Sequence, residues 1–490
     1  MPEKQIHIRL PEQAHRELRV KCAYEGVTIQ DFVQNLIGEQ LELYGPPSVE
    51  EHKRLPSQTT TSPRQGVECP DDLPVRGELE AKYADRIVDR PELRWLASNV
   101  PNKTIPFQRW FRYKEAFSHE FPQVALSRFD LRRDGTVLDP FCGVGTVLFA
   151  VRELGYRAKG FDLLPLAVFA SRVKLRTPEE YDLDALRSRV TELCSTRPGK
   201  PQSSLPDIAI LPKAFDAQTA EELLFLRDKI LQEPNVAIRE FLLLGLLAVA
   251  EEVSHTCKDG LGIKLQKKAN IPRVQQSLGR QLRMMIADLT GALGFSRNGG
   301  SASAALADAR NLPLKSGAVA GIITSPPYLN RYDYARIYSI ELALGFLSSF
   351  AELRDLRHSL LRGYIEARPA TSEKVNRGVV PAVLERLKAV PLNNPNIPTM
   401  IKAYFEDMYD AIAEMGRVCR PGGHVGMLIG NSRFGGEVIP VDLVLSEIAE
   451  SHGFATREIW VLHYKGNASQ QMGRYGQQRV RESIIFWQKE

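Results

Sequence analysis

Cysteine is scarce in this sequence, with six residues among 490 and no Cys-x-x-Cys pair. Such scattered cysteines argue against a zinc finger and against a disulfide framework, so we expect no metal site and a reducing, cytoplasmic environment. No run of about 18 apolar residues occurs, so the sequence predicts no membrane span. The first residues are polar and charged, which does not fit a signal peptide.

The sequence also lacks a large excess of one sign of charge. It has 64 Lys and Arg and 59 Asp and Glu, which gives a net charge of +5. This weak positive charge permits a polyanionic partner without requiring one, and its distribution matters more than its sum. With 43% apolar and 25% charged residues, the composition is that of a globular protein. At roughly 100–200 residues per domain, the length predicts several units.

Residues 1–44 are predicted to form a small module of one strand and two helices. Apolar and polar residues alternate from 5 to 10, as in a strand, and two short amphipathic segments follow. A unit this small cannot easily bury its own core, so we expect it to dimerise. It resembles the ribbon-helix-helix fold, whose paired strands enter the DNA major groove, and a packing module without base contact is the alternative. The resemblance implies base-facing positions at Gln5, His7 and Arg9.

Residues 45–75 are rich in Pro, Ser, Thr and Gln, which is typical of a linker. Beyond it, apolar strands alternate with helices, which predicts an α/β domain with a doubly wound, mostly parallel sheet. The strands fall in 76–180 and in 301–490, while the leucine-rich and mostly helical residues 181–300 form an insertion beside the sheet. We expect strands at 136–142, 158–163, 320–325, 423–430, 459–464 and 483–487, the last two as an antiparallel pair.

The clearest cofactor signal is the segment V-L-D-P-F-C-G-V-G-T at 137–146. An apolar strand runs into Gly143 and Gly145, which allow a tight turn and close approach of the backbone to a ligand. The third glycine of the dinucleotide fingerprint is missing. Asp162 ends the next predicted strand and suits ribose hydroxyls, and Asp308 suits an adenine amino group.

A second anchor is the segment T-S-P-P-Y at 324–328, where an apolar strand ends in two prolines and an aromatic ring. The prolines stiffen the turn and remove two N–H donors, so the preceding carbonyls are open to other donors. Ser325 and the carbonyl of Pro326 can accept from an amino group and orient its protons. A strand that merely ends in a Pro-Pro turn is the structural alternative.

Together, the two segments resemble the motifs of the amino-methylating DNA methyltransferases. In that family, a methyl group passes from S-adenosylmethionine to an exocyclic amino nitrogen of a base that has left the duplex. The resemblance covers roughly 105–175 and 305–490, and it implies a Rossmann-like class I methyltransferase fold. It assigns cofactor binding to Asp139, Pro140, Phe141, Gly143, Gly145, Thr146, Asp162 and Asp308, and catalysis to Ser325, Pro326, Pro327 and Tyr328.

The target base is indicated by the first residue of the catalytic motif. Serine there is similar to the N4-cytosine members and aspartate to most N6-adenine members, so we expect cytosine N4, with adenine N6 as the alternative. Transfer would be direct, with Tyr328 stacked on the extruded base. C5-cytosine methylation is disfavoured because no Pro-Cys pair occurs. An RNA methyltransferase and a DNA-binding regulator with a vestigial domain are further alternatives.

DNA is the expected partner, and the resemblance also implies a cognate restriction endonuclease. Residues 264–283 contain six Lys and Arg and no acidic residue, which suggests phosphate contacts or a solvated face. The Gly- and Gln-rich tract 464–481 suggests a specificity loop or a loop over the site. Residues 331–334 are expected to line the base pocket or to pack, and 114–117 resembles the family's upstream cofactor segment. The predicted phosphate contacts are Lys264, Lys267, Lys268 and Arg273.

Overall fold

A computed structural model describes residues 73–259, 262–292, 300–465 and 479–490 of the chain. The predicted ribbon-helix-helix module, with Gln5, His7 and Arg9, lies outside the described residues, as do the linker up to residue 72 and most of the tract 464–481.

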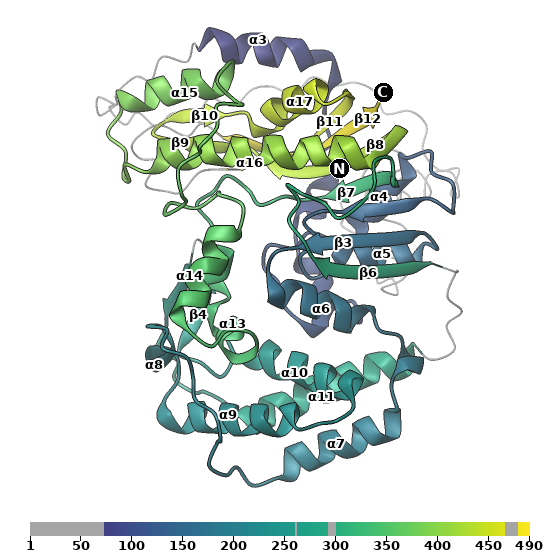
Figure 1. The fold of residues 1–490 in the computed structure, drawn as a ribbon, viewed down its shortest axis with the longest axis vertical. Coiled ribbons are helices and arrows are strands. Elements are labelled where there is room, and N and C mark those ends of the chain that lie inside the picture. Colours follow the sequence, from purple (N-terminus) through teal and green to yellow (C-terminus); the bar gives the residue numbers. More distant parts are fainter. Residues whose placement is uncertain (1–72, 260–261, 293–299, 466–478) are drawn as a thin grey trace, which may run out of the picture.

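An eight-stranded sheet forms the centre of the described chain, in the order β1-β11-β12-β8-β7-β2-β3-β6 (Figure 1). Neighbouring strands run parallel, except that β12 is antiparallel to both β11 and β8. This confirms the predicted mostly parallel sheet and the antiparallel pairing of the last two strands of the chain. The strands are β1 (Ile87–Asp89), β11 (Phe454–Lys465), β12 (Val480–Lys489), β8 (Cys419–Gly430), β7 (Val319–Thr324), β2 (Thr136–Asp139), β3 (Arg157–Asp162) and β6 (Ser301–Leu306).

Helices cover both faces of the sheet, because successive strand residues point to opposite sides. In β2, Val137 packs into the core of one face and Leu138 into the core of the other. The first face is covered by α4 (Glu120–Ser127), α5 (Thr146–Glu153) and α6 (Pro165–Leu175). The second face carries α3 (Pro74–Tyr83), α15 (Val379–Lys388), α16 (Ile397–Val418) and α17 (Val441–Ser451), as Figure 1 shows. The doubly wound prediction is confirmed.

Two edge strands, β1 and β6, were not predicted from the sequence. The strand β6 reads Ser-Ala-Ser-Ala-Ala-Leu, and its residues are exposed or half-buried, so it lacks an apolar run. It pairs with β3 over six residues, and Asp308 follows two positions after its end. The predicted linker also overlaps the fold slightly, because α3 begins at Pro74.

The region between residues 181 and 300 is mostly helical and lies below the sheet in Figure 1. Its helix α10 is mostly apolar and is buried from Phe241 to Leu247, as expected for the central helix of a bundle. The carboxylate of Asp288 in α11 accepts from the indole N–H of Trp110 (2.9 Å) and pairs with Arg109, which fixes the bundle to the sheet domain. The elements are α7 (Leu183–Ser195), α8 (Leu211–Ala214), α9 (Ala217–Leu231), α10 (Val236–Val249), β4 (Thr256–Asp259), β5 (Gly262–Leu265) and α11 (Val274–Gly291).

Three helices lead from the catalytic segment back toward this bundle, namely α12 (Tyr334–Ile337), α13 (Ser339–Gly345) and α14 (Phe350–Ser359). A small hairpin of β9 (Ser432–Phe434) and β10 (Glu437–Ile439) follows β8. Within the described ranges, no helix is both long and apolar enough to cross a membrane.

Candidate active site

The glycine loop between β2 and α5 depends on two left-handed residues. Gly143 has a φ of +49° and Gly145 a φ of +83°, angles that residues with a side chain rarely adopt. A Cβ at position 145 would lie 2.8 Å from the hydroxyl oxygen of Ser171. That hydroxyl donates a hydrogen bond to the carbonyl of Gly143 (2.8 Å), so α6 holds the loop in place.

Asp162, at the end of β3, fixes the loop from the other side. Its carboxylate accepts hydrogen bonds from the N–H groups of Gly143 (2.9 Å) and Leu164 (2.8 Å). Burial raises the pKa of Asp162 above its ordinary value. The loop backbone and the carboxylate predicted to bind ribose therefore form one hydrogen-bonded unit.

Asp139, at the end of β2, joins the glycine loop to the catalytic strand. Its carboxylate is 1% exposed and accepts from the hydroxyl of Thr324 (2.7 Å) and the N–H of Phe141 (3.1 Å). Burial raises the pKa of Asp139 to about 7, although both hydrogen bonds favour the charged form. Because Thr324 directly precedes Ser325, this bond connects the two predicted motifs.

Both motifs line a single pocket at the carboxyl ends of β2, β3 and β7 and just beyond β6. Parallel α/β sheets bind their ligands at this edge. Four predicted residues do not line this pocket, namely Asp139, Gly145, Pro326 and Tyr328. Asp139 holds the loop through the N–H of Phe141, and Pro326 is buried. The predicted residues that line the pocket are Pro140, Phe141, Gly143, Thr146, Asp162, Asp308, Ser325 and Pro327.

The remaining pocket wall contains residues that sequence reasoning did not assign. Arg310 was visible beside Asp308 but has no motif of its own. The other unassigned residues are hydrophobic or small. They are Tyr113, Cys142, Val144, Leu163, Leu164, Ala307, Ala309, Leu360 and Leu361. Cys142 and Val144 stand inside the glycine motif, and the sequence offers no signal for the rest.

The tracts 114–117 and 331–334, whose roles the sequence did not decide, also line the pocket through Glu115 and Tyr334. The carboxylate of Glu115 accepts from the hydroxyl of Tyr338 (2.6 Å), and burial raises the pKa of Glu115 to about 7. Tyr113 stacks on Tyr338 with 4.8 Å between ring centroids and on Tyr334 with 6.5 Å. The upstream segment and the segment after the catalytic turn thus meet in one aromatic stack.

The catalytic turn is held by contacts on both sides. The carbonyl of Pro327 accepts from the hydroxyl of Tyr404 (3.0 Å), which anchors the turn to α16. The ring of Tyr328 lies against Gly430, where a Cβ would be 3.0 Å from the ring. Burial, and then the nearby carboxylate of Glu482, raise the pKa of Tyr328 well above its ordinary value, so the hydroxyl stays protonated.

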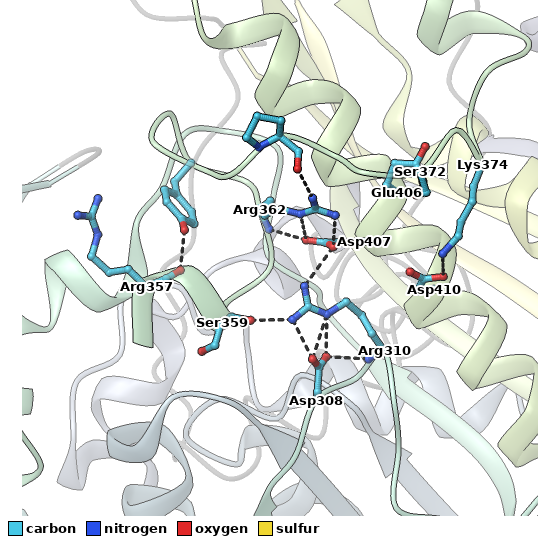
Figure 2. A network of polar contacts seen from close by, with 12 residues as sticks. Asp308, Arg310, Arg357, Ser359, Arg362, Ser372, Lys374, Glu406, Asp407 and Asp410 are labelled. Carbon is cyan, nitrogen blue, oxygen red and sulfur yellow. Dashed lines mark hydrogen bonds and ion pairs between the residues drawn. The ribbon is translucent and has the colours of Figure 1, made fainter. Parts of the chain in front are cut away.

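Asp308, predicted to accept from an adenine amino group, already has a partner. Its carboxylate accepts from the backbone N–H of Arg310 (2.9 Å) and forms a two-pronged ion pair with the same residue's guanidinium, at 2.9 and 2.8 Å. Figure 2 shows this pair at the edge of a larger network. The side chain of Asp308 is still 34% exposed, which leaves it accessible from the pocket.

Members of the basic run 264–283 differ in their exposure and in the contacts that hold them. The ammonium of Lys268 donates to the carbonyls of Glu251 (2.6 Å) and Glu252 (3.3 Å), and Arg280 pairs with the carboxylate of Glu252. Lys264, Lys267 and Arg273 have exposed side chains. Lys268 and Arg280 therefore stabilise the fold of the insertion.

The fold is Rossmann-like, and its pocket lies between the glycine loop and Ser325 of the Ser-Pro-Pro-Tyr turn. No family model matches the chain. Over 473 residues it is 31% identical to the type II methyltransferase M.BsoBI of Geobacillus stearothermophilus, covering 84% of this chain and 92% of that protein. It is also 31% identical over 453 residues to the type II methyltransferase M.AvaI of Anabaena variabilis, with the same coverage.

The chain therefore belongs to the family of type II methyltransferases. This confirms the predicted methyltransferase class, with S-adenosylmethionine as the cofactor.

Solved structures give only distant matches. A SAM-dependent methyltransferase of Methanosarcina mazei is 10% identical with a TM-score of 0.27, over 74% of this chain and 96% of that one. A geranyl diphosphate methyltransferase in complex with SAM is 7% identical with a TM-score of 0.28, over 76% and 86%. Likenesses this weak add nothing to the assignment.

Proposed function

We propose that this protein is a site-specific DNA methyltransferase that transfers the methyl group of S-adenosylmethionine to the exocyclic amino group of an extruded base, cytosine N4. The observation that carries the proposal is the pocket shared by the glycine loop and Ser325. The hydrogen bond between Asp139 and Thr324 keeps the two segments together.

The cofactor fits the pocket by the chemistry of its walls. Asp162 would accept from ribose hydroxyls, and the exposed part of the Asp308 carboxylate would accept from the adenine amino group. The backbone at Gly143 has no Cβ in the way, and Pro140, Phe141 and Thr146 complete the wall. When bound, the cofactor supplies a sulfonium methyl group.

Ser325 and the Pro326 carbonyl would orient the amino group of the base. Both would accept hydrogen bonds from its N–H groups, leaving the nitrogen lone pair directed toward the methyl donor. The carbonyl of Pro327 already accepts a hydrogen bond from Tyr404, so Pro327 would contribute by fixing the shape of the turn. Tyr328 would stack on the extruded base, an interaction worth roughly 1–3 kcal/mol per base.

Cytosine N4 is favoured over adenine N6 by the serine at position 325. Methylation of adenine N6 is the outcome against which this proposal is tested.

DNA would be held by two separate regions. Lys264, Lys267, Lys268 and Arg273 would contact phosphates, with Lys268 acting mainly through the fold. The amino-terminal residues Gln5, His7 and Arg9 would contact bases in a ribbon-helix-helix dimer. A cognate restriction endonuclease, which cuts the same site when it is unmethylated, would be the partner enzyme.

The decisive experiment follows tritium from S-adenosylmethionine into a mixed-sequence duplex. Wild type should label the duplex, Ser325→Ala should lose at least about a hundredfold of the rate, and Ser195→Ala should behave as wild type. Ser195 is a matched control because it is an exposed helical serine outside the pocket. Label in RNA rather than duplex DNA, or equal activity of Ser325→Ala, would overturn the proposal.

The dimer is tested by the mass of the full chain and of a chain that starts at residue 73. Sedimentation of the full chain should give a particle of two copies, and the shortened chain a particle of one. Equal numbers of copies in the two particles would contradict dimerisation through residues 1–44.

A further inference from the structure

Arg310 lies in the wall of the cofactor pocket and connects three groups. Its guanidinium binds the carboxylate of Asp308 and lies 3.1 Å from the carboxylate of Asp407 in α16. It also donates to the backbone carbonyl of Ser359 (2.7 Å) at the end of α14. Figure 2 shows Arg310 between the two aspartates.

Arg362 approaches the same Asp407 from the opposite side. Its backbone N–H (2.8 Å), its Nε (3.0 Å) and its Nη2 (2.7 Å) all donate to that carboxylate, which is 3% exposed. The cluster holds two arginines and two aspartates, so its charges balance. A buried carboxylate that is paired on two sides is held firmly, because leaving either cation unpaired would be unfavourable.

The residues between these two arginine contacts form a strap, defined as residues 359–363. At one end of the strap, Arg310 donates to the carbonyl of Ser359, and near the other end the N–H of Arg362 donates to Asp407. Its two leucines, Leu360 and Leu361, line the cofactor pocket. A Cβ at Gly363 would lie 3.1 Å from the carbonyl oxygen of Tyr328, so the strap also abuts the catalytic turn.

Arg310 also fixes the orientation of the Asp308 carboxylate. One oxygen accepts the backbone N–H and the Nε of Arg310, each at 2.9 Å, and the other accepts Nη2 at 2.8 Å. A carboxylate has about four lone-pair sites, so the remaining capacity faces a fixed direction. The planar guanidinium is required for this, because a lysine ammonium is a point charge without a fork.

We propose that Arg310 is a positioning residue for the cofactor. Arg310 orients the Asp308 carboxylate toward the pocket and holds the strap in place as a part of the pocket wall. The inference rests on the proposed function, because it assigns the pocket to S-adenosylmethionine. It predicts that Arg310 controls cofactor affinity and leaves the chemical step nearly unchanged.

The test compares Arg310→Lys and Asp407→Asn with Arg417→Lys. Arg417 is the matched control, because it also binds a carboxylate (Glu414) and backbone carbonyls (Leu312 and Leu314), and it is absent from the residues lining the described pocket. Equilibrium binding of S-adenosylmethionine, steady-state methylation and hydrogen exchange of the strap amides are measured for each protein.

Arg310→Lys should raise Kd and KM for S-adenosylmethionine about tenfold while kcat stays within about threefold. Asp407→Asn should change them in the same direction, and Arg417→Lys should not. In wild type the cofactor should slow exchange in residues 359–363, and in Arg310→Lys this protection should be lost.

An Arg310→Lys protein with unchanged Kd and intact protection, or one whose kcat alone falls, would overturn the inference. Equal loss of affinity in Arg417→Lys would overturn it as well, because the effect would then be general destabilisation. If wild type itself fails to bind the cofactor, the proposed function fails first. If wild type binds and Arg310→Lys binds equally well, only this inference fails.

Discussion

The hydroxyl of Tyr328 lies 3.0 Å from a carboxylate oxygen of Glu482, and Glu482 pairs in turn with Lys465 (2.5 Å) and His463 (3.3 Å). The carboxylate side chain is only 2% exposed. With Gly430 against its Cδ2–Cε2 edge, the Tyr328 ring is fixed before any base arrives. A preset ring reduces the entropy lost when a base stacks on it.

The ring of Tyr328 should therefore matter more than its hydroxyl. Tyr328→Phe keeps the ring and should lower kcat/KM for DNA by less than about tenfold, whereas Tyr328→Ala should lower it by about tenfold to a hundredfold. Steady-state methylation at saturating cofactor separates the two variants. Equal losses in the phenylalanine and alanine variants would mean that the hydroxyl carries the effect.

Gly430→Ala should displace the same ring through its Cδ2–Cε2 edge. The new Cβ would meet the ring at 3.0 and 3.1 Å, so Tyr328 must shift, and small displacements at a reacting centre are costly. We expect kcat to fall about tenfold while the affinity for S-adenosylmethionine is unchanged. Gly77→Ala is the control, since a Cβ there meets nothing within 4 Å. Unchanged kcat in Gly430→Ala would show that the ring position is unimportant.

Glu115 should make stability depend on pH. Its pKa is raised from 4.5 to about 7, chiefly by burial, so the folded state binds this proton more tightly than the unfolded chain. The resulting stabilisation is fully present below about pH 4.5 and is lost as the pH rises through 7. Relative to Glu115→Gln, wild type should therefore lose free energy of unfolding over this window.

Urea unfolding of wild type and Glu115→Gln across this pH range measures the difference directly. Asp139 also has a raised pKa, but it is present in both proteins and cancels from the comparison. Two stability curves that run parallel with pH would contradict the assignment of this titration to Glu115.

The exposed basic residues of the insertion should contribute to DNA affinity in a salt-dependent way. Lys267→Ala and Arg273→Ala should each weaken binding to any duplex and reduce the slope of log K against log salt by about 1. Lys388→Ala is the control, because Lys388 lies on α15 and is 69% exposed. Salt slopes identical to wild type would exclude these two residues from the phosphate contacts.

Much of the site was predictable because its two anchors are local in sequence. The glycine loop and the Ser-Pro-Pro-Tyr turn follow apolar strands, so strand pattern and turn residues together indicated their place at the sheet edge. The edge strand β6 was missed because small, exposed residues carry no periodic signal. Tertiary contacts over long separations were also invisible, such as Arg310 with Ser359, 49 positions apart, and Tyr328 with Glu482, 154 apart.

Identification of the methylated nucleoside is the sharpest test of methyl transfer to cytosine N4 in this pocket. Duplex DNA is methylated with the purified protein, digested to nucleosides and weighed by mass spectrometry. Convergence of the glycine loop and Ser325 on one pocket predicts methyl transfer. The serine at position 325 predicts N4-methyldeoxycytidine as the product. N6-methyldeoxyadenosine would contradict the cytosine assignment, and the absence of any methylated nucleoside would contradict the methyltransferase account of this pocket.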